Sequence, residues 1–163
     1  MSHVVSHDTV VKEEHLDCFA QACTDCGLEF KPNQKNYKFF GSWVNDYHKD
    51  DAAYKNGFDP KEFGKCEHAA SVKDKPDAYE IGLVKRPNGQ PGYNLLCDFY
   101  AKGRGLMEHV SQDGPSGKVP DKLLQQYAAR VAEKKLKQAG FGMQRKVNSK
   151  GHIVIEAIRI RQN

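Results

Sequence analysis

The stretch AYEIGLVKRPNGQPGYNLLCDFY, residues 78–100, holds two apolar segments on either side of a run of turn-forming residues. Tyr79, Ile81 and Leu83 occupy alternate positions of the first segment, the period of a β-strand with one buried face. The turn formers at 87–92 then reverse the chain, and YNLLCDFY returns as a second strand. The stretch therefore predicts an antiparallel β-hairpin.

Amphipathic segments before and after this hairpin predict two main helices. Within residues 12–27, Leu16, Phe19 and Cys23 recur at helical spacing, and a glycine closes the segment. Residues 120–139 carry a second apolar stripe, which ends at Gly140. Strands and helices in this order predict an α+β fold: a mostly antiparallel sheet with two main helices on one face, of ferredoxin-like or related split β-α-β topology.

The remaining segments complete the prediction of one domain over residues 1–163. β-Branched residues in 3–11 predict a first strand, and 103–110 predict a weak further one. Residues 141–160 predict a terminal hairpin; its last strand has apolar groups on both faces, which is typical of a central or well-covered strand. Residues 42–76 mix aromatic, charged and turn-forming residues, and we expect an irregular insertion there.

Composition limits where the protein acts. The chain has 163 residues, 39% of them hydrophobic, and no apolar run of the length that spans a membrane. The opening MSHVVSHD lacks the basic and apolar regions of a secretory signal. Five cysteines, an odd number without such a signal, favour reduced thiols. We therefore expect a cytoplasmic protein with no membrane partner.

Several segments together carry a family resemblance. They are the opening MSH before a β-branched strand, the helix ending near CGLEF, PGYNLLCDFY at 91–100, and LLQQYAARVAEKKLKQAGF followed by KGHIVIEAIR. The chain resembles the uncharacterised family called domain of unknown function twelve-fifty-seven, with plastid, cyanobacterial, bacterial and phage members. The resemblance implies a fold grouping and a cytoplasmic or stromal-type setting, and it implies no cofactor or catalytic set. Residues 42–76 depart from the family, in which this stretch is usually shorter.

The segment DCFAQACTDCG, residues 17–27, raises the question of a metal cluster. Its C-x4-C-x2-C spacing is the one that plant-type ferredoxins use for three cluster ligands. On a helix, however, Cys18 does not readily join the edge shared by Cys23 and Cys26, so plain helix cysteines are favoured. We expect no cofactor. A metal or iron–sulfur protein is the third hypothesis, with these candidate ligands: Cys18, Cys23, Cys26, Cys66 and His68.

The charge of the chain is uneven. Residues 120–163 carry ten Lys and Arg against three Asp and Glu, whereas residues 1–60 carry six against ten. Such a basic end can bind nucleic acid, although lysine on a solvated helix face and an edge strand also explains it. The candidate nucleic-acid contacts are Arg130, Lys134, Lys135, Lys137, Arg145, Lys146, Lys150, Arg159 and Arg161. The absence of interleaved aromatic residues on these strands disfavours this alternative.

The leading hypothesis is a non-enzymatic binding or accessory protein that acts through a protein–protein surface. No nucleophile elbow or phosphate loop is present, so no catalytic residue is predicted and an enzyme is disfavoured. Aromatic and charged residues gather in residues 42–63, a composition common at contact sites. The candidate partner contacts are Trp43, Tyr47, Tyr54, Phe58 and Phe63.

Overall fold

The computed structural model describes residues 4–40 and 52–160. Its main elements are β1 (Val4–Val11), α1 (Leu16–Asp25), β2 (Leu28–Lys31), α3 (Ala52–Lys55), β3 (His68–Val72), β4 (Ile81–Lys85), β5 (Tyr93–Asp98), α4 (Met107–Val110), α5 (Asp121–Gln138), β6 (Phe141–Val147) and β7 (Ile153–Arg159). The α+β class predicted from the sequence is confirmed. None of the described helices is both long and apolar enough to cross a membrane.

Five strands form the main sheet, in the order β1-β5-β4-β3-β2, and every neighbouring pair is antiparallel. The predicted hairpin is its β4–β5 pair, in which Leu83 lies opposite Leu95. Helix α1 connects β1 to β2, which lie at the two opposite edges with the other three strands between them. The two strands of this β-α-β unit are therefore split apart by the rest of the sheet.

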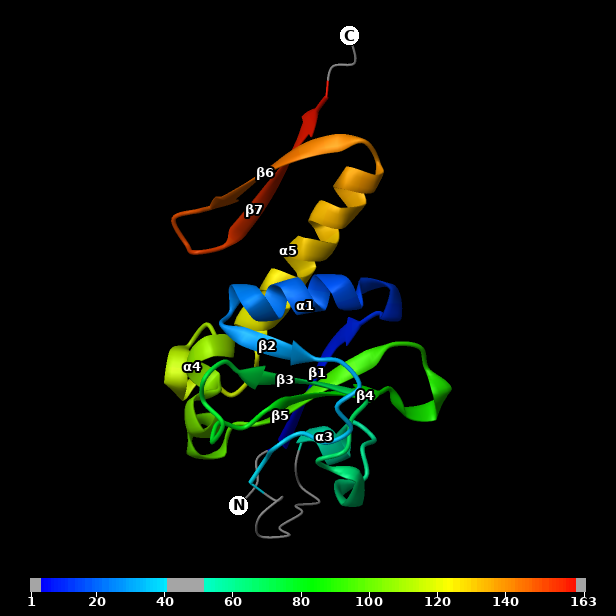
Figure 1. Ribbon diagram of the computed structural model, residues 1–163, viewed down its shortest axis with the longest axis vertical. Helices are drawn as coiled ribbons and strands as arrows, with labels where there is room; N and C mark the ends of the chain where they lie inside the picture. The colour runs from blue at the N-terminus through cyan, green and yellow to red at the C-terminus, as the bar shows by residue number, and fades with distance from the viewer. Residues whose placement is uncertain (1–3, 41–51, 161–163) are drawn as a thin grey trace.

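Helices α1 and α5 cover one face of the sheet (Figure 1). Phe19 of α1 and Tyr127 of α5 meet edge to face, with ring centroids 6.2 Å apart. Both belong to one buried cluster with Ile81 and Leu95 of the central strands. The helical apolar stripes and the alternating strand residues thus bury each other, which is the main source of stability in such layers.

Two described parts of the segment between β2 and β3, residues 37–39 and 53–66, cover the other face. Tyr37, Phe39, Phe58 and Phe63 form a second buried cluster with Leu96 of β5. Strand β5 is consequently buried along its whole length, polar residues included. A strand covered on both faces shows a continuous apolar run rather than alternation, which accounts for the sequence NLLC at 94–97.

Two parts of the chain differ from their predictions. Strand β3, His68–Val72, lies within the range expected to be irregular, and it joins β2 to β4 inside the sheet. Residues 101–104, which overlap the start of the weak strand expected at 103–110, instead form a left-handed turn with φ between 49° and 63°, and α4 follows. Strand β3 was not predicted because the small side chains of HAASV show little alternation between apolar and polar residues.

Strands β6 and β7 form a separate two-stranded sheet that packs on α5, beyond the main sheet (Figure 1). The predicted terminal hairpin is therefore confirmed. The expectation that its last strand is central or well covered is wrong, because β7 has a single neighbouring strand and most of its residues are exposed.

Candidate functional site

The hairpin β6–β7 is built around a compact polar turn. Its register pairs Phe141 with Arg159 at the open end and Val147 with Ile153 beside the turn. The Asn148 side-chain oxygen accepts hydrogen bonds from the backbone amides of residues 150 and 152, both 2.9 Å long. Such self-bonding by asparagine is the usual way in which a turn of this kind is stabilised. These bonds lie within residues 148–152, so the local sequence stabilises the turn itself.

The two faces of the hairpin differ in what they contact. On the odd-numbered face, Arg145 bonds to Glu133 of α5, and Arg145, Ile153 and Ile155 in the middle of the hairpin are half-buried, whereas Phe141 and Val147 at its two ends are exposed. Even-numbered residues face outwards, among them Val154 and Ile158. The outer face therefore exposes β-branched apolar side chains, which proteins ordinarily bury.

Exposed apolar side chains concentrate on this hairpin. Among the described residues, eight large hydrophobic side chains are exposed, and six of them lie between 141 and 160. The six are Phe141, Met143, Val147, Val154, Ile158 and Ile160. By the register of the hairpin, Val154, Ile158 and Ile160 lie on its outer face, whereas Phe141, Met143 and Val147 lie on the other face. Exposed apolar side chains that gather in this way mark an interaction site more often than a scattered exposed residue does.

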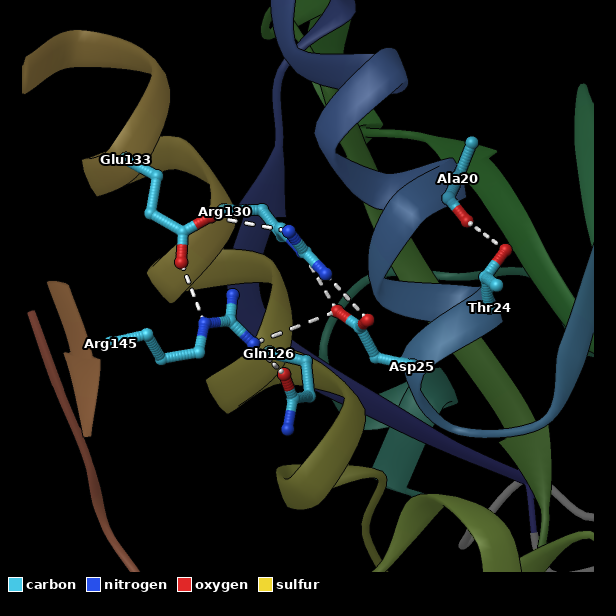
Figure 2. Close-up of polar contacts among 7 residues, drawn as sticks. All are labelled: Ala20, Thr24, Asp25, Gln126, Arg130, Glu133 and Arg145. Atoms are coloured by element: carbon cyan, nitrogen blue, oxygen red, sulfur yellow. Dashed lines mark hydrogen bonds and ion pairs between the residues drawn. The ribbon is translucent and has the colours of Figure 1, made fainter. Parts of the chain in front are cut away.

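A charged network fastens the hairpin to the body of the molecule (Figure 2). Arg130 donates to both carboxylate oxygens of Asp25, over 2.8 and 2.6 Å, and these bonds raise the pKa of the guanidinium. Arg145 of β6 donates to Glu133, over 2.6 Å, and to Gln126, over 3.0 Å. We call these five residues the anchoring network, because they join α1, α5 and β6.

The anchoring network surrounds a buried carboxylate. Glu133 is among the buried residues, and it also accepts a bond from Arg130 over 3.3 Å. An ionised carboxylate is stable in such a position only when cations or hydrogen-bond donors satisfy it. Arg130 and Arg145, which the sequence offered as phosphate contacts, are therefore engaged within the chain.

The other predicted nucleic-acid contacts divide into two groups. Lys134 lies 2.9 Å from an Asp17 carboxylate oxygen, and Lys146 lies 3.0 Å from one of Glu156. Within the described part of the chain, these exposed residues make no ion pair: Lys135, Lys137, Lys150 and Arg159. Arg161 lies outside the described residues. Fewer basic side chains are therefore free to bind nucleic acid than the ten Lys and Arg of residues 120–163 suggest.

The predicted aromatic contacts are not brought together on one surface. Trp43 and Tyr47 lie outside the described residues, and Tyr54 is exposed. Phe58 and Phe63 are buried, and Phe63 packs edge to face against Phe39 with ring centroids 6.5 Å apart. These two side chains complete the core on the second face of the sheet instead of forming a contact surface.

The predicted metal ligands are also separated. The Cys66 thiol donates to the Gln34 carbonyl over 3.1 Å, and His68 accepts a bond from the Asn33 amide over 2.9 Å. Cys23 of α1 and Cys26 just after it are buried, and neither belongs to a group of three potential ligands among the described residues. Cys18 lies beside His15 and Asp17, two residues that the sequence did not single out.

The sequence did contain a signal for the exposed hairpin residues. Apolar side chains on both faces of the last strand are typical of a strand that is packed on both faces. No part of the described chain packs on its outer face. What the sequence could not show is that the strand lies at the edge of a two-stranded sheet, because strand partners are chosen by tertiary packing.

Comparison of the chain with protein-family models, with curated proteins and with solved structures found no significant match. The family resemblance drawn from short segments of the sequence therefore stays a prediction.

Proposed function

We propose that this chain is a binding protein that takes up an extended, acidic and apolar segment of a partner protein along strand β7. The observation that carries the proposal is the concentration of exposed apolar side chains on a two-stranded hairpin that packs mainly on α5. Isolated two-stranded hairpins are marginally stable in water, so a third strand and a cover for the outer face would stabilise this one.

Strand β7 has the backbone required for such pairing. It pairs with β6 on one side, so its other edge has no strand partner in the described residues. Unpaired edge groups bind extended peptides in the mode called β-augmentation, in which backbone hydrogen bonds give affinity and alternate side chains give specificity. Val154 and Ile158 would supply the alternate apolar contacts on the outer face.

The positive charge of the hairpin favours an acidic partner. Residues 141–160 carry four Lys and Arg but a single acidic residue, Glu156. Lys150 and Arg159 are exposed and unpaired within the described residues. An acidic strand would meet complementary charge, whereas the hairpin of a second copy would bring like charges together. Nucleic acid is the less favoured partner, because several of the cations form ion pairs and the exposed hairpin side chains include one aromatic ring, Phe141.

A fluorescence anisotropy titration tests the proposal. The probes are a labelled peptide of alternating valine and glutamate, its valine and lysine counterpart, and a single-stranded RNA of uridines. We expect the acidic peptide alone to bind, and Ile158→Glu to weaken its binding at least tenfold by adding repulsion to a lost apolar contact. Tyr54→Glu, at an exposed aromatic residue outside the hairpin, is the matched control.

Each other outcome contradicts the proposal. These outcomes are no binding of the acidic peptide, equal binding by the Ile158→Glu chain, or salt-dependent binding of the RNA in its place. Sedimentation showing a dimer that Ile158→Glu dissociates would make a second copy the partner instead. Val154→Glu serves as a second variant on the same face, and circular dichroism confirms that each variant is folded.

A further inference from the structure

Three potential metal ligands meet where helix α1 begins. His15 ends a short 3-10 turn and precedes the first residue of α1, and Asp17 and Cys18 follow in its first turn. One ligand atom from each side chain lies within 4.8 Å of the others. Among the side chains that the structure describes, no other group of three such residues occurs.

We propose that His15, Asp17 and Cys18 bind a single zinc ion. Thiolate, imidazole and carboxylate are the three donor types that zinc accepts, and three protein ligands leave a fourth position for water. A thiolate and an imidazole disfavour magnesium and calcium, which prefer oxygen donors throughout. This site is independent of the peptide-binding surface proposed for β7.

Burial makes two of these side chains suited to hold an ion. Cys18 is 2% exposed and His15 is 8% exposed. The His15 Nδ1 atom is buried, and no described residue hydrogen-bonds to it. A buried polar atom without a partner is costly, so a histidine in this position is better explained if its ring has a ligand outside the protein.

The three ligand atoms need to move only a little closer together to bind one zinc ion. With zinc bonds of about 2.0–2.3 Å, the donors of a tetrahedral site lie about 3.3–3.6 Å apart. The three ligand atoms lie within 4.8 Å of one another, so the widest separation must shorten by at most about 1.5 Å. Asp17 is exposed and can rotate towards the ion. Asp17 and Cys18 line a groove on the surface, with Arg130, Lys134 and Lys137 of α5 on its other side.

Lys134 competes with the ion for Asp17. Its ammonium group lies 2.9 Å from the Asp17 Oδ1 atom and 2.7 Å from the Glu14 carbonyl oxygen. Zinc binding must share or displace this contact. Removing the ammonium charge should therefore tighten metal binding, a direction opposite to the effect of removing a ligand.

Titration of the full chain with Co²⁺ as a spectroscopic substitute for zinc tests the site. We expect one equivalent to bind, with a thiolate-to-cobalt charge-transfer band and the visible bands of tetrahedral cobalt, and zinc to abolish both. Cys18→Ala should remove the charge-transfer band. His15→Gln and Asp17→Asn should each weaken binding at least tenfold, since even loss of a residue that orients a ligand costs about 10–100-fold.

Two further variants sharpen the test. Cys23→Ala removes a buried cysteine of the same helix that lies outside the cluster, so its cobalt spectrum should match that of the unaltered chain. Lys134→Gln should lower the dissociation constant. The proposal is overturned if the unaltered chain shows no thiolate band, if Cys18→Ala keeps it, or if Asp17→Asn, at an exposed residue and shown by circular dichroism to be folded, binds with unchanged affinity.

Discussion

Gly82 shows how one residue fixes the packing of a whole face of the sheet. It lies in β4, opposite Ala69 on one side and Leu96 on the other. The ring of Tyr37 rests directly on it, and a Cβ atom at residue 82 would lie 2.3 Å from a ring carbon. Burial of Tyr37 also raises the pKa of its hydroxyl group. The glycine is therefore required by the close approach of an aromatic side chain.

Substitution of this glycine should destabilise the protein. We expect Gly82→Ala to lower the free energy of unfolding by about 1–3 kcal/mol, because the added methyl group forces the buried ring to move. Urea denaturation followed by circular dichroism measures the change. Gly142→Ala is the matched control, since the nearest atom to its added Cβ lies 3.6 Å away. Equal effects of the two substitutions would contradict this account of Gly82.

Among the elements, the hairpin β6–β7 depends most on one polar contact. The bond from Arg145 to buried Glu133 joins the hairpin to α5. The pair between Lys146 and Glu156, by contrast, lies within the hairpin, and both side chains are about half exposed. Exposed pairs of that kind contribute little to stability, whereas a charged hydrogen bond to a buried carboxylate contributes more.

Removal of the Arg145 guanidinium should loosen the hairpin alone. We expect Arg145→Met to speed amide hydrogen exchange in β6 and β7 about tenfold, the equivalent of about 1.4 kcal/mol for a lost charged hydrogen bond. Exchange in β1–β5 should stay the same, and Lys146→Met should change little. Faster exchange throughout the molecule would show instead that the anchoring network supports the main sheet.

For the whole molecule, buried thiols link stability to pH. All five cysteines are free and buried. Burial raises the pKa of Cys97 and of Cys66 to about 12, and that of Cys26 to about 11, from an ordinary value of 9.0. The folded state therefore keeps protons that the unfolded chain releases. Stability is fully present below pH 9 and declines as the pH rises from there towards the folded pKa values.

Alkaline conditions should accordingly weaken the fold before they ionise its thiols. We expect the urea midpoint to fall steadily between about pH 9 and pH 11, with a loss of about 1 kcal/mol at pH 10 from Cys97 alone. Cys97→Ala should start from a lower stability but show a shallower decline with pH. A midpoint that does not change over this range would contradict the burial of the thiols.

Local sequence patterns determined most of the elements, though only part of the site. Alternation over 78–100 gave the β4–β5 hairpin, and helical spacing gave α1 and α5, because each pattern reflects the geometry of its own element. Strand β3 was not predicted because its small residues show little alternation between apolar and polar side chains. Cys18 was a candidate metal ligand from the sequence, whereas His15 and Asp17 were not, because their spacing to Cys18 is not typical of a metal site.

Tertiary structure alone decided which apolar groups are covered. Phe58 and Ile158 are both hydrophobic residues. From the sequence, Phe58 was predicted to lie on a contact surface and Ile158 in a well-covered strand. Packing reversed both: Phe58 closes the second face of the main sheet, and Ile158 lies exposed on a two-stranded hairpin. Hydrophobicity is a property of the side chain and can be identified in the sequence. Burial depends on which distant segment lies against that side chain, and only the folded chain decides this.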